Sequence, residues 1–563
     1  MATILSKYVL PIAALIVFGT HQTAFSTVVG LLDSGAILNQ IQTPPALPSP
    51  PNNPMMLMDQ EAIDIPPAGQ SFALKRIQIT GHNDADYAIL HALVADAEGK
   101  NLSLAQLHQL AFRITVYYRK KGYPLMQAII RPQVIRAGVV QITVVMARYG
   151  NVTLNNRSEV RNDLLQATLS SVNKGQDIAQ AELDRALLLL TDIPGVAVTA
   201  TLKAGDKVDT SDLLVSTSTL PRFLGNTAVD NFGNSYTGQG RVGINLSVIN
   251  PLNLRTGDSL TLDGLTSNQQ MRYGRLAYDS LLNGQGSRLG GAYSMLNYRL
   301  ATPLQANGTA QMSSLWLKQP LIRRKVNNLY GMLQHDSLKL RDHIDSQAIK
   351  TDRHLSNWTL SMVGDARDEL LSGGSNSWAL GWTQGRVGFD DASAQLANAA
   401  TVNTQGSFSK WTASLTRSQR ISSETSLYLA ASGQRASSNL DSSQKMTLGG
   451  PFAVRAYDSG AVTGDNGQLV TVEFRHALGQ PWGGQLTGMA FADSAHVTVN
   501  KTLWHGTTGP NSALLSGVGL GVQWSGPQQW TARAYMAAPV GASSVLTGRN
   551  PSARVWLETR KGF

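Results

Sequence analysis

The sequence predicts two small α+β units followed by an antiparallel β-barrel that crosses a membrane. Three observations predict this fold class. The order strand, helix, helix, strand, strand occurs twice between residues 72 and 220. From residue 221 onward, helical periodicity gives way to alternating apolar and polar positions, in segments separated by Gly, Asn, Asp and Ser. The chain then ends on a strand-like segment that closes with the aromatic Phe563.

Composition bounds the class of protein and the kinds of site. The chain of 563 residues has no cysteine, which excludes disulfides and thiolate sites. After the N-terminus no stretch reaches the roughly 20 apolar residues of a spanning helix, whereas barrel strands alternate and average out in hydropathy. The formal charge of +10 comes from dispersed cations, with no run of five. We therefore assign this charge to solubility and interfacial anchoring, and we expect no nucleic-acid partner.

The N-terminal segment predicts export from the cytoplasm. Residues 1–26 combine one cation, an apolar run too short to span a membrane and a small-residue cleavage site, as a secretory signal peptide does. Residues 27–42 carry leucines and isoleucines in the pattern of a short amphipathic helix. Residues 43–71 begin with TPPALPSPPNNP, whose prolines favour an extended linker. This linker is either a plain spacer or a tether for a detachable helix.

The two α/β units cover residues 72–147 and 148–220. In the first unit, the strand LKRIQIT precedes two helices, and Ser103 and Gln106 form a capping box at the start of the second. Two strands complete this unit. In the second unit, a leucine-lined helix begins near Asp177 and ends at a Pro-Gly pair before the last two strands.

Residues 221–563 are assigned to the barrel. The segment RVGINLSVIN, residues 241–250, places apolar side chains on one face and polar side chains on the other. At roughly 10 residues per spanning strand plus connections, this length accommodates about 16 antiparallel strands. A soluble sandwich or propeller would share the alternation, but the aromatic end at Phe563 favours a membrane barrel.

No motif recommends catalysis. GQGRVG at residues 238–243 has the glycine spacing of a dinucleotide loop, yet an alternating strand continues directly from it, so no strand-to-helix transition is present. His335, His343 and His354 fit no common zinc spacing, and we assign them to a solvated loop. No nucleophile elbow or acid pair stands out. We therefore expect no enzyme, no cofactor and no metal site.

The segment LGGPFAVRAYD, residues 448–458, is the candidate functional loop. Its glycines and proline mark a loop, yet it carries apolar and aromatic side chains, among them Phe452, around Arg455. Such a segment is expected to be buried, and a buried guanidinium without a partner is costly. Asp493, close after Phe491 in a strand-like run, is the candidate acceptor for a bidentate contact. The alternative is that Asp493 is an ordinary polar residue facing the lumen.

These residues resemble the outer-membrane transporters of two-partner secretion, the TpsB-type family of haemolysin activators and filamentous-haemagglutinin transporters. LGGPFAVRAY is similar to the loop motif of the family, which usually ends Val-Arg-Gly-Tyr or Phe, with Ala456 in place of glycine. FADSA is similar to its Phe-x-Asp-x-Gly strand motif, with Ala495 in place of glycine. Residues 229–262 resemble the first barrel hairpin, and residues 121–144 resemble the end of the first POTRA domain. The likeness covers about residues 72 to 563.

The resemblance implies a fold and a location in the Gram-negative outer membrane. It implies a signal peptide, a plug helix in the pore, two POTRA domains in the periplasm and a 16-stranded barrel. It also implies that the loop enters the lumen, where Arg455 pairs with Asp493, and that the chain end is the barrel-assembly signal. Lys561 departs from the apolar third-last residue of the family, and it can snorkel to the interface. The residues that the resemblance assigns to these roles are Val454, Arg455, Ala456, Tyr457, Phe491, Asp493 and Phe563.

The function that follows is translocation of one large secreted protein, an adhesin, haemolysin or toxin. We expect the POTRA domains to bind it by strand addition at an exposed sheet edge. Outer-membrane lipids and, during biogenesis, the barrel-assembly machinery are the other expected partners. Two alternatives stay open. A barrel-assembly insertase shares the plan but usually carries more POTRA copies, and a passive porin leaves the periplasmic domains without a role.

Overall fold

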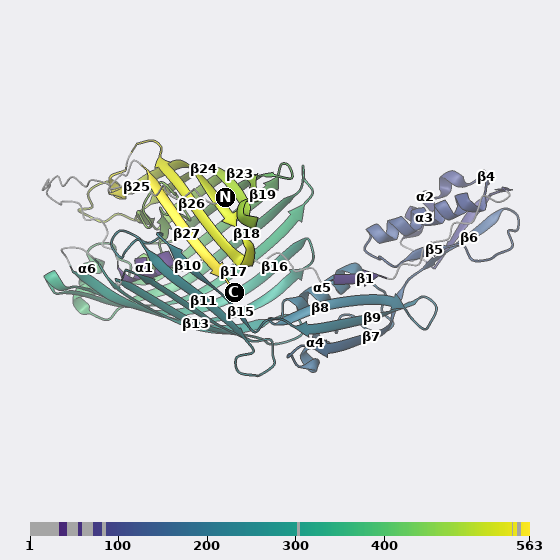
Figure 1. Cartoon of the computed structure of the whole chain (residues 1–563), viewed down its shortest axis with the longest axis horizontal. Helices are drawn as coiled ribbons and strands as arrows, with labels where there is room; N and C mark the ends of the chain where they lie inside the picture. Colours follow the sequence, from purple (N-terminus) through teal and green to yellow (C-terminus); the bar gives the residue numbers. More distant parts are fainter. Residues whose placement is uncertain are drawn as a thin grey trace, which may run out of the picture. The chain divides into compact units, whose positions relative to one another are not determined.

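The structure is a computed structural model that describes residues 33–41, 55–58, 71–81, 86–268, 270–300, 305–542, 544–548 and 553–563. The expected signal peptide and most of the expected linker lie outside the described residues. Figure 1 shows the α/β units in violet and blue and the barrel strands in teal to yellow. None of the described helices combines the length and the hydropathy needed to cross a membrane.

The first α/β unit packs two helices on a three-stranded sheet of order β3-β6-β5, in which β3 and β6 are parallel. The expected capping box begins α3, because the Ser103 side chain accepts from the Gln106 N–H and the Gln106 side chain accepts from the Ser103 N–H. Leu107 and Ile114 on α3 are fully buried against the sheet. The elements are β2 (Phe72–Ala73), β3 (Arg76–Thr80), α2 (Tyr87–Ala92), β4 (Asn101–Leu102), α3 (Leu104–Lys120), β5 (Gln127–Ile129) and β6 (Val139–Val145).

The second α/β unit has the same order, and its own core is formed largely by leucines of its helices. Its sheet has the order β1-β8-β9-β7, so a strand from the expected linker extends it. That strand, β1, runs parallel to β8, with Met55 opposite Thr199. The expected linker, residues 43–71, therefore contains a strand, which directly follows its proline-rich stretch. The elements are β1 (Met55–Met58), β7 (Arg148–Arg157), α4 (Asn162–Thr168), α5 (Gln180–Thr191), β8 (Val196–Ala204) and β9 (Thr210–Thr219).

The rest of the chain forms a closed antiparallel barrel of 16 strands, which confirms the predicted fold class. Neighbours in sequence are neighbours in space, and the last strand pairs with the first, so no edge is left unpaired. The strands are β10 (Phe223–Asp230), β11 (Arg241–Ile249), β12 (Ser259–Ser267), β13 (Met271–Leu281), β14 (Arg288–Arg299), β15 (Ala306–Arg323), β16 (Asn327–Ile344), β17 (Ile349–Asp368), β18 (Gly374–Phe389), β19 (Gly406–Arg420), β20 (Thr425–Ala436), β23 (Asn466–Gly479), β24 (Gln485–Thr498), β25 (Ser512–Ser525), β26 (Trp530–Pro539) and β27 (Arg554–Gly562).

The dyad repeat in the sequence corresponds to the two faces of the barrel wall. On β11, Val242 is 53% exposed and Ile244 is 44% exposed, whereas the intervening side chains face the lumen. At the lumen face, Arg241 binds Asp230 of the neighbouring strand at 2.8 Å. A continuous apolar outer face on a closed barrel is the surface that lipid covers. The alternation that a sandwich would have shared therefore belongs to a membrane barrel.

The three histidines assigned to a solvated loop lie instead on barrel strands. His335 and His343 belong to β16, and His354 belongs to β17. These strands have 18 and 20 residues, longer than the apolar band requires. At their outer ends the outward side chains are polar, while the apolar Leu338 and Leu340 of β16 are buried on the lumen face, so these ends lack the pattern of a lipid-facing strand. No group of three or more metal-ligating side chains occurs among the described residues.

Two helices and a short ribbon are not part of the barrel wall. The helix α1 (Ser34–Ile41) has its longest apolar side chains, Ile37 and Leu38, fully buried. The long connection between β20 and β23 contains a two-stranded ribbon of β21 (Met446–Leu448) and β22 (Val462–Gly464), and we call residues 449–461 between them the ribbon loop. A last helix, α6 (Ala392–Ala399), follows β18 and is capped by Asp391.

Candidate functional site

The ribbon loop folds inward against the barrel wall. Gly449 and Gly450 have φ angles of +93° and +107°, a conformation that only glycine adopts readily, and they begin the turn. Val454 and Ala456 have no exposed surface. Phe452 differs from the expectation of a wholly buried segment, because it is 76% exposed. Its ring meets that of Phe232 in the β10–β11 connection edge to face, which leaves the other side open.

Arg455 is held by a cluster that we define as Arg455, Asp493, Glu473 and Phe491. Its Nε and one terminal nitrogen donate to the two carboxylate oxygens of Asp493, each at 2.9 Å. The backbone N–H of Arg455 donates to the same carboxylate at 3.1 Å. The other terminal nitrogen donates to Glu473 at 2.6 Å. All three charged side chains are nearly inaccessible to solvent, so the bidentate contact fixes the loop in one position.

Glu473 on β23 is a member of the cluster that sequence reasoning missed. It lies directly opposite Phe491 in the pairing of β23 with β24, while Thr471 lies opposite Asp493. Arg475, two residues further along the same face, donates to Glu473 at 2.7 Å. The site therefore contains two arginines and two carboxylates, which balances its formal charge. The sequence does contain a signal for Glu473. Thr471, Glu473 and Arg475 occupy every second position of one strand, which places all three side chains on its lumen face.

Aromatic side chains complete the surroundings of the guanidinium. The Arg455 guanidinium carbon lies 3.3 Å from the ring centroid of Phe491, a close cation–π contact. Trp556 on β27 donates from its indole nitrogen to the Arg455 carbonyl oxygen at 2.7 Å. Burial disfavours the charged form of Arg455, but the hydrogen bonds and charges of Asp493 and Glu473 outweigh it and raise the pKa of Arg455. The guanidinium thus stays charged at any physiological pH.

The two alanines that replace family glycines lie in the packed core around Tyr457 of the loop. A Cβ placed on Gly517 of β25 would lie 2.5 Å from the Ala456 methyl group. The methyl at 456 therefore fits because its neighbour on the wall is itself a glycine. Ala495 is 2% exposed and belongs to the same apolar cluster. The loop and the wall therefore still approach closely, because the contact pairs Ala456 of the loop with Gly517 of the wall.

A second buried arginine holds α1 against the lumen face of β14 to β17. Arg353 on β17 donates to Asp33 and Asp342 at 2.7 Å and to Asp441 at 2.6 Å. We call these four residues the Arg353 cluster. Asp33 immediately precedes α1, and Asp441 lies in the connection before the ribbon. Ser34, the first residue of α1, donates to Asp342 through its backbone at 2.8 Å and its hydroxyl at 2.9 Å.

The Arg353 cluster has an excess of negative charge. Three carboxylates share one guanidinium, and the Tyr298 hydroxyl adds a hydrogen bond to Asp342 at 2.7 Å. Burial raises the pKa of Asp33, Arg353 lowers it, and the charges of Asp342 and Asp441 raise it further, so the net shift is upward. The contact that anchors α1 is therefore ionisable, and repulsion of Asp33 by Asp342 and Asp441 weakens it.

The remaining contacts of α1 join it to the ribbon and to the β10–β11 connection. Asn39 donates to the Lys445 carbonyl oxygen at 2.5 Å, and Gln40 accepts from Asn234 at 3.1 Å. Gly35 faces the short connection before the ribbon, where an added Cβ would lie 2.7 Å from the Ser442 hydroxyl. The helix is thus attached by polar groups at both ends and by a short apolar face that contains Ile37 and Leu38.

Phe563 closes the barrel rather than entering the cluster. Its backbone exchanges two hydrogen bonds with Gly225 of β10, each at 3.0 Å. Its ring covers the position where a Cβ on Gly225 would lie, and it is 52% exposed. Lys561 donates to the Gly562 carbonyl oxygen at 3.0 Å, and its amine lies 5.7 Å from the Trp530 ring centroid. The amine is thus placed at the rim of the barrel.

The family is established by comparison with known proteins. The family described as "Haemolysin secretion/activation protein ShlB/FhaC/HecB" matches residues 209–524, and the ShlB-type POTRA domain matches residues 72–146. The chain belongs to the ShlB/FhaC/HecB family. It is therefore a transporter of two-partner secretion in the outer membrane, with its POTRA domains in the periplasm.

Relatives match this transporter over most of its length. The heme/hemopexin transporter protein HuxB of Haemophilus influenzae is 29% identical over 505 residues, which cover 88% of each chain. The outer membrane transporter CdiB of Dickeya dadantii is 22% identical and covers 78% of this chain and 80% of its own. Among solved structures, CdiB from Escherichia coli has a TM-score of 0.69 at 18% identity, covering 90% of this chain and 93% of its own. That likeness shows the shared fold.

Proposed function

We propose that this transporter exports one large secreted protein through its barrel, and that α1 leaves the lumen when the client enters. The observation that carries the proposal is the polar attachment of α1. Its N-terminal end is held by Arg353, Asp342 and Ser442, all groups that water or a passing polar chain could satisfy instead. A helix fixed by a large apolar face would be far harder to release.

The Arg455 cluster has a different part in the proposal. Its ion pairs are buried with matched charge and a stacked Phe491, and the loop is also bound through the Arg455 carbonyl oxygen. Removing one partner of such a pair leaves an uncompensated buried charge, at a cost of roughly 3–5 kcal/mol. We therefore assign Arg455 and Asp493 to holding the ribbon loop, which defines the conduit, while α1 is the part that moves.

Client recognition is proposed to occur by strand addition to a POTRA sheet. In the second unit, the β8 edge is already covered by β1 of the chain itself. A client strand at this edge must displace β1, which is joined to α1 through residues 42–54. Client binding would then pull on the segment that holds the plug helix. An extended client segment is suited to this because main-chain hydrogen bonds supply affinity at a sheet edge.

The driving force is proposed to come from the client itself. The sequence contains no strand-to-helix phosphate loop that would hold a nucleotide. Folding of the exported protein at the cell surface buries apolar area and so opposes return through the pore. The kind of client is indicated by the relative HuxB, whose name specifies heme/hemopexin transport. We propose that the first candidate client is a secreted protein involved in heme/hemopexin transport, ahead of adhesins and toxins.

The experiment that tests the proposal is export of a large secreted protein encoded beside this chain. The protein is measured in culture supernatant and on the cell surface, with the transporter present or deleted. Loss of export on deletion, with other outer-membrane proteins at normal levels, is the expected result. Continued export, together with failure of other barrels to assemble, would contradict it and favour an insertase.

The insertase alternative rests on a shared fold. BamA from Haemophilus ducreyi lacking POTRA domains 1–3 has a TM-score of 0.51 at 14% identity, and the match covers 88% of this chain.

A matched test of the strand-addition step replaces both Met56 and Leu57 by proline. At least one of two successive N–H groups faces β8, so the double substitution removes a hydrogen bond between β1 and β8. We expect tighter binding of an N-terminal client fragment to this variant. Leu47→Pro, in the part of the linker already rich in proline, is the control.

A further inference from the structure

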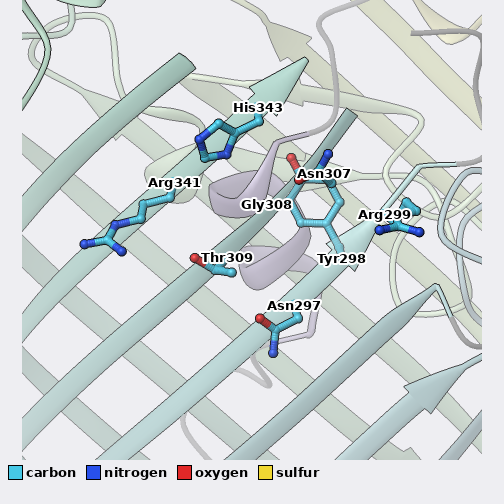
Figure 2. Close-up of a pocket in the computed structure, with 8 residues that line it drawn as sticks. All are labelled: Asn297, Tyr298, Arg299, Asn307, Gly308, Thr309, Arg341 and His343. Atoms are coloured by element: carbon cyan, nitrogen blue, oxygen red, sulfur yellow. The ribbon is translucent and has the colours of Figure 1, made fainter. Parts of the chain in front are cut away.

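The outer wall of the barrel carries an open hollow of about 400 Å³ across β14, β15 and β16. Figure 2 shows it near the ends of these strands, with α1 visible behind the wall. The side chains that matter for its chemistry are Asn297, Arg299, Asn307, Thr309, Arg341 and His343. We call this hollow the outer-wall pocket.

Strand alternation places these side chains on the lipid side of the wall. Tyr298 and Asp342 face the lumen, since they bind one another and Asp342 binds α1. Successive side chains of a strand point to opposite faces. Arg341 and His343, on either side of Asp342, therefore face outward, and Arg299 does so beside Tyr298. The pocket and the anchor of α1 thus lie back to back on the same strands.

The pocket lies beyond the apolar band, at the end of the barrel away from the POTRA domains. It borders that band on β14, whereas on β16 the polar outward residues His335, Ser337 and Lys339 separate it from Leu333. Along β14, the outward residues Tyr293 and Met295 are 49% and 38% exposed, and the next two outward positions are Asn297 and Arg299. The other end of these strands adjoins the second POTRA domain, where Arg323 binds Asp192 at 2.7 Å. Because the POTRA domains are periplasmic, the pocket lies at the headgroup level of the outer leaflet.

The donors are arranged in adjacent rows of the sheet. Arg299 lies opposite Asn307, and Asn307 lies opposite His343. The next row toward the apolar band, about 7 Å away along the strands, contains Asn297, Thr309 and Arg341. The first row therefore has a basic side chain at each end, Arg299 and His343, and the second row adds Arg341. Guanidinium forks with neighbouring amide and hydroxyl donors form the donor set that binds phosphate oxygens.

The basic groups of the pocket form no ion pair with a described residue. Within the described ranges, the side chains of Arg299, Arg341 and His343 make no ion pair or hydrogen bond. Two acidic residues are nearby. Asp345 accepts from Asn307 at 2.9 Å, and Asp352 lies opposite Arg341 on β17 without an ion pair between them. The pocket thus has spare donors next to a lipid-covered wall.

We propose that the outer-wall pocket binds a phosphate group of a phosphorylated glycolipid in the outer leaflet. On β14, the outward Tyr293 and Met295 precede the pocket and would contact the acyl chains, while Arg299 and Arg341 hold the phosphate. A soluble anion would gain nothing from that apolar border.

The test measures the glycolipid retained by the full chain in detergent, by native mass spectrometry. The probes are a bis-phosphorylated lipid A glycolipid and the same glycolipid with its phosphates removed. We expect the double variant Arg299→Ser with Arg341→Ser to retain the phosphorylated probe about tenfold less than the unchanged chain. The control is Arg435→Ser on β20, an outward arginine at the same end of the barrel and outside the pocket.

Each outcome decides the proposal. Equal retention by the double variant, or equal retention of the dephosphorylated probe, overturns it. Displacement of the glycolipid by millimolar inorganic phosphate would assign the pocket to free phosphate and also overturn it. The heat-dependent shift in gel mobility shows whether each variant is a folded barrel. If the double variant does not fold, Thr309→Glu, which adds a negative charge to the pocket, must give the same loss or the proposal fails.

Discussion

At the scale of single residues, two buried arginines fix the interior of this barrel by different balances of charge. Arg455 meets two carboxylates, and one of these is shared with Arg475, so charges match. Arg353 meets three carboxylates without a second cation. A matched cluster holds its segment in place, while an excess of like charge makes a contact that protonation can modulate. The two sites therefore differ in what pH and mutation should do.

The first prediction concerns Arg455→Lys. Lysine keeps the positive charge but lacks the planar fork that bonds Asp493 twice and Glu473 once. A lysine amine cannot bond Asp493 twice and Glu473 once, so one of the two buried carboxylates would lose its contact with residue 455, which we expect to destabilise the docked loop by roughly 3 kcal/mol. Export of the client should fall almost as far as in Arg455→Ala, while heat-dependent gel mobility still reports a folded barrel. Normal export from the lysine variant would show that export does not require the bidentate contact.

The second prediction is that α1 is released more readily as pH rises. The pKa of Asp33 is raised above its ordinary value of 3.8 in the docked state, mainly by burial and by Asp342 and Asp441. The docked state therefore binds the proton more tightly than the released state. Stabilisation of docking by this group is complete below the released pKa and is lost as pH rises through the docked pKa. Conductance of the reconstituted pore should thus increase with pH.

The control for this pH dependence is Asp33→Asn. The amide keeps the shape of the side chain and does not titrate, so conductance should become less dependent on pH. The titratable and charged groups that face Asp33 are Arg353, Asp342 and Asp441, all of which remain in this variant. An unchanged slope of conductance against pH in Asp33→Asn would assign the effect to another group.

At the scale of elements, the N-terminal segment contributes two pieces to domains far from it in sequence. The helix α1 enters the barrel, and β1 adds to the sheet of the second POTRA domain. The third prediction follows from the tight fit of α1. Gly35→Val should weaken docking, because even a Cβ would lie 2.7 Å from the Ser442 hydroxyl and 2.9 Å from the Ser443 nitrogen. Pore conductance in planar bilayers should rise accordingly.

The matched control is Gly274→Val on β13. A Cβ at Gly274 meets no heavy atom within 4 Å, so the substitution adds the same side chain to open space on the barrel wall. Its conductance should equal that of the unchanged chain. If both valine variants conduct alike, the effect comes from the barrel as a whole and not from displacement of α1.

At the scale of the whole molecule, the barrel is a closed ring, so its two end strands must find each other. The fourth prediction is that deletion of Phe563 reduces the yield of folded barrel. The residue exchanges two backbone hydrogen bonds with Gly225 and covers that glycine with its ring. Folded barrel is quantified by heat-dependent gel mobility, and Lys561→Leu serves as a control that keeps the ring.

Sequence reasoning reached the repeated POTRA order and the barrel because both are patterns of local period. The strand period of two in residues 241–250 and the capping box at Ser103 are fixed by neighbouring residues. The prediction of a solvated loop is wrong at the outer ends of β16 and β17, where the apolar Leu338 and Leu340 face the lumen and the outward side chains are polar. This reversed pattern differs from that of a lipid-facing strand, so it does not predict the row that contains His343.

By itself, the sequence determined the fold class, and it indicated Asp493 as the candidate partner of Arg455 without excluding an ordinary polar residue facing the lumen. Only the tertiary structure decided which side chains complete each cluster. Glu473, Arg353 and Asp342 lie on different strands, and their meeting depends on the register of a closed barrel. Ring closure fixes that register through long-range hydrogen bonds, which no local pattern of residues encodes. The attachment of α1 and the outer-wall pocket both follow from it.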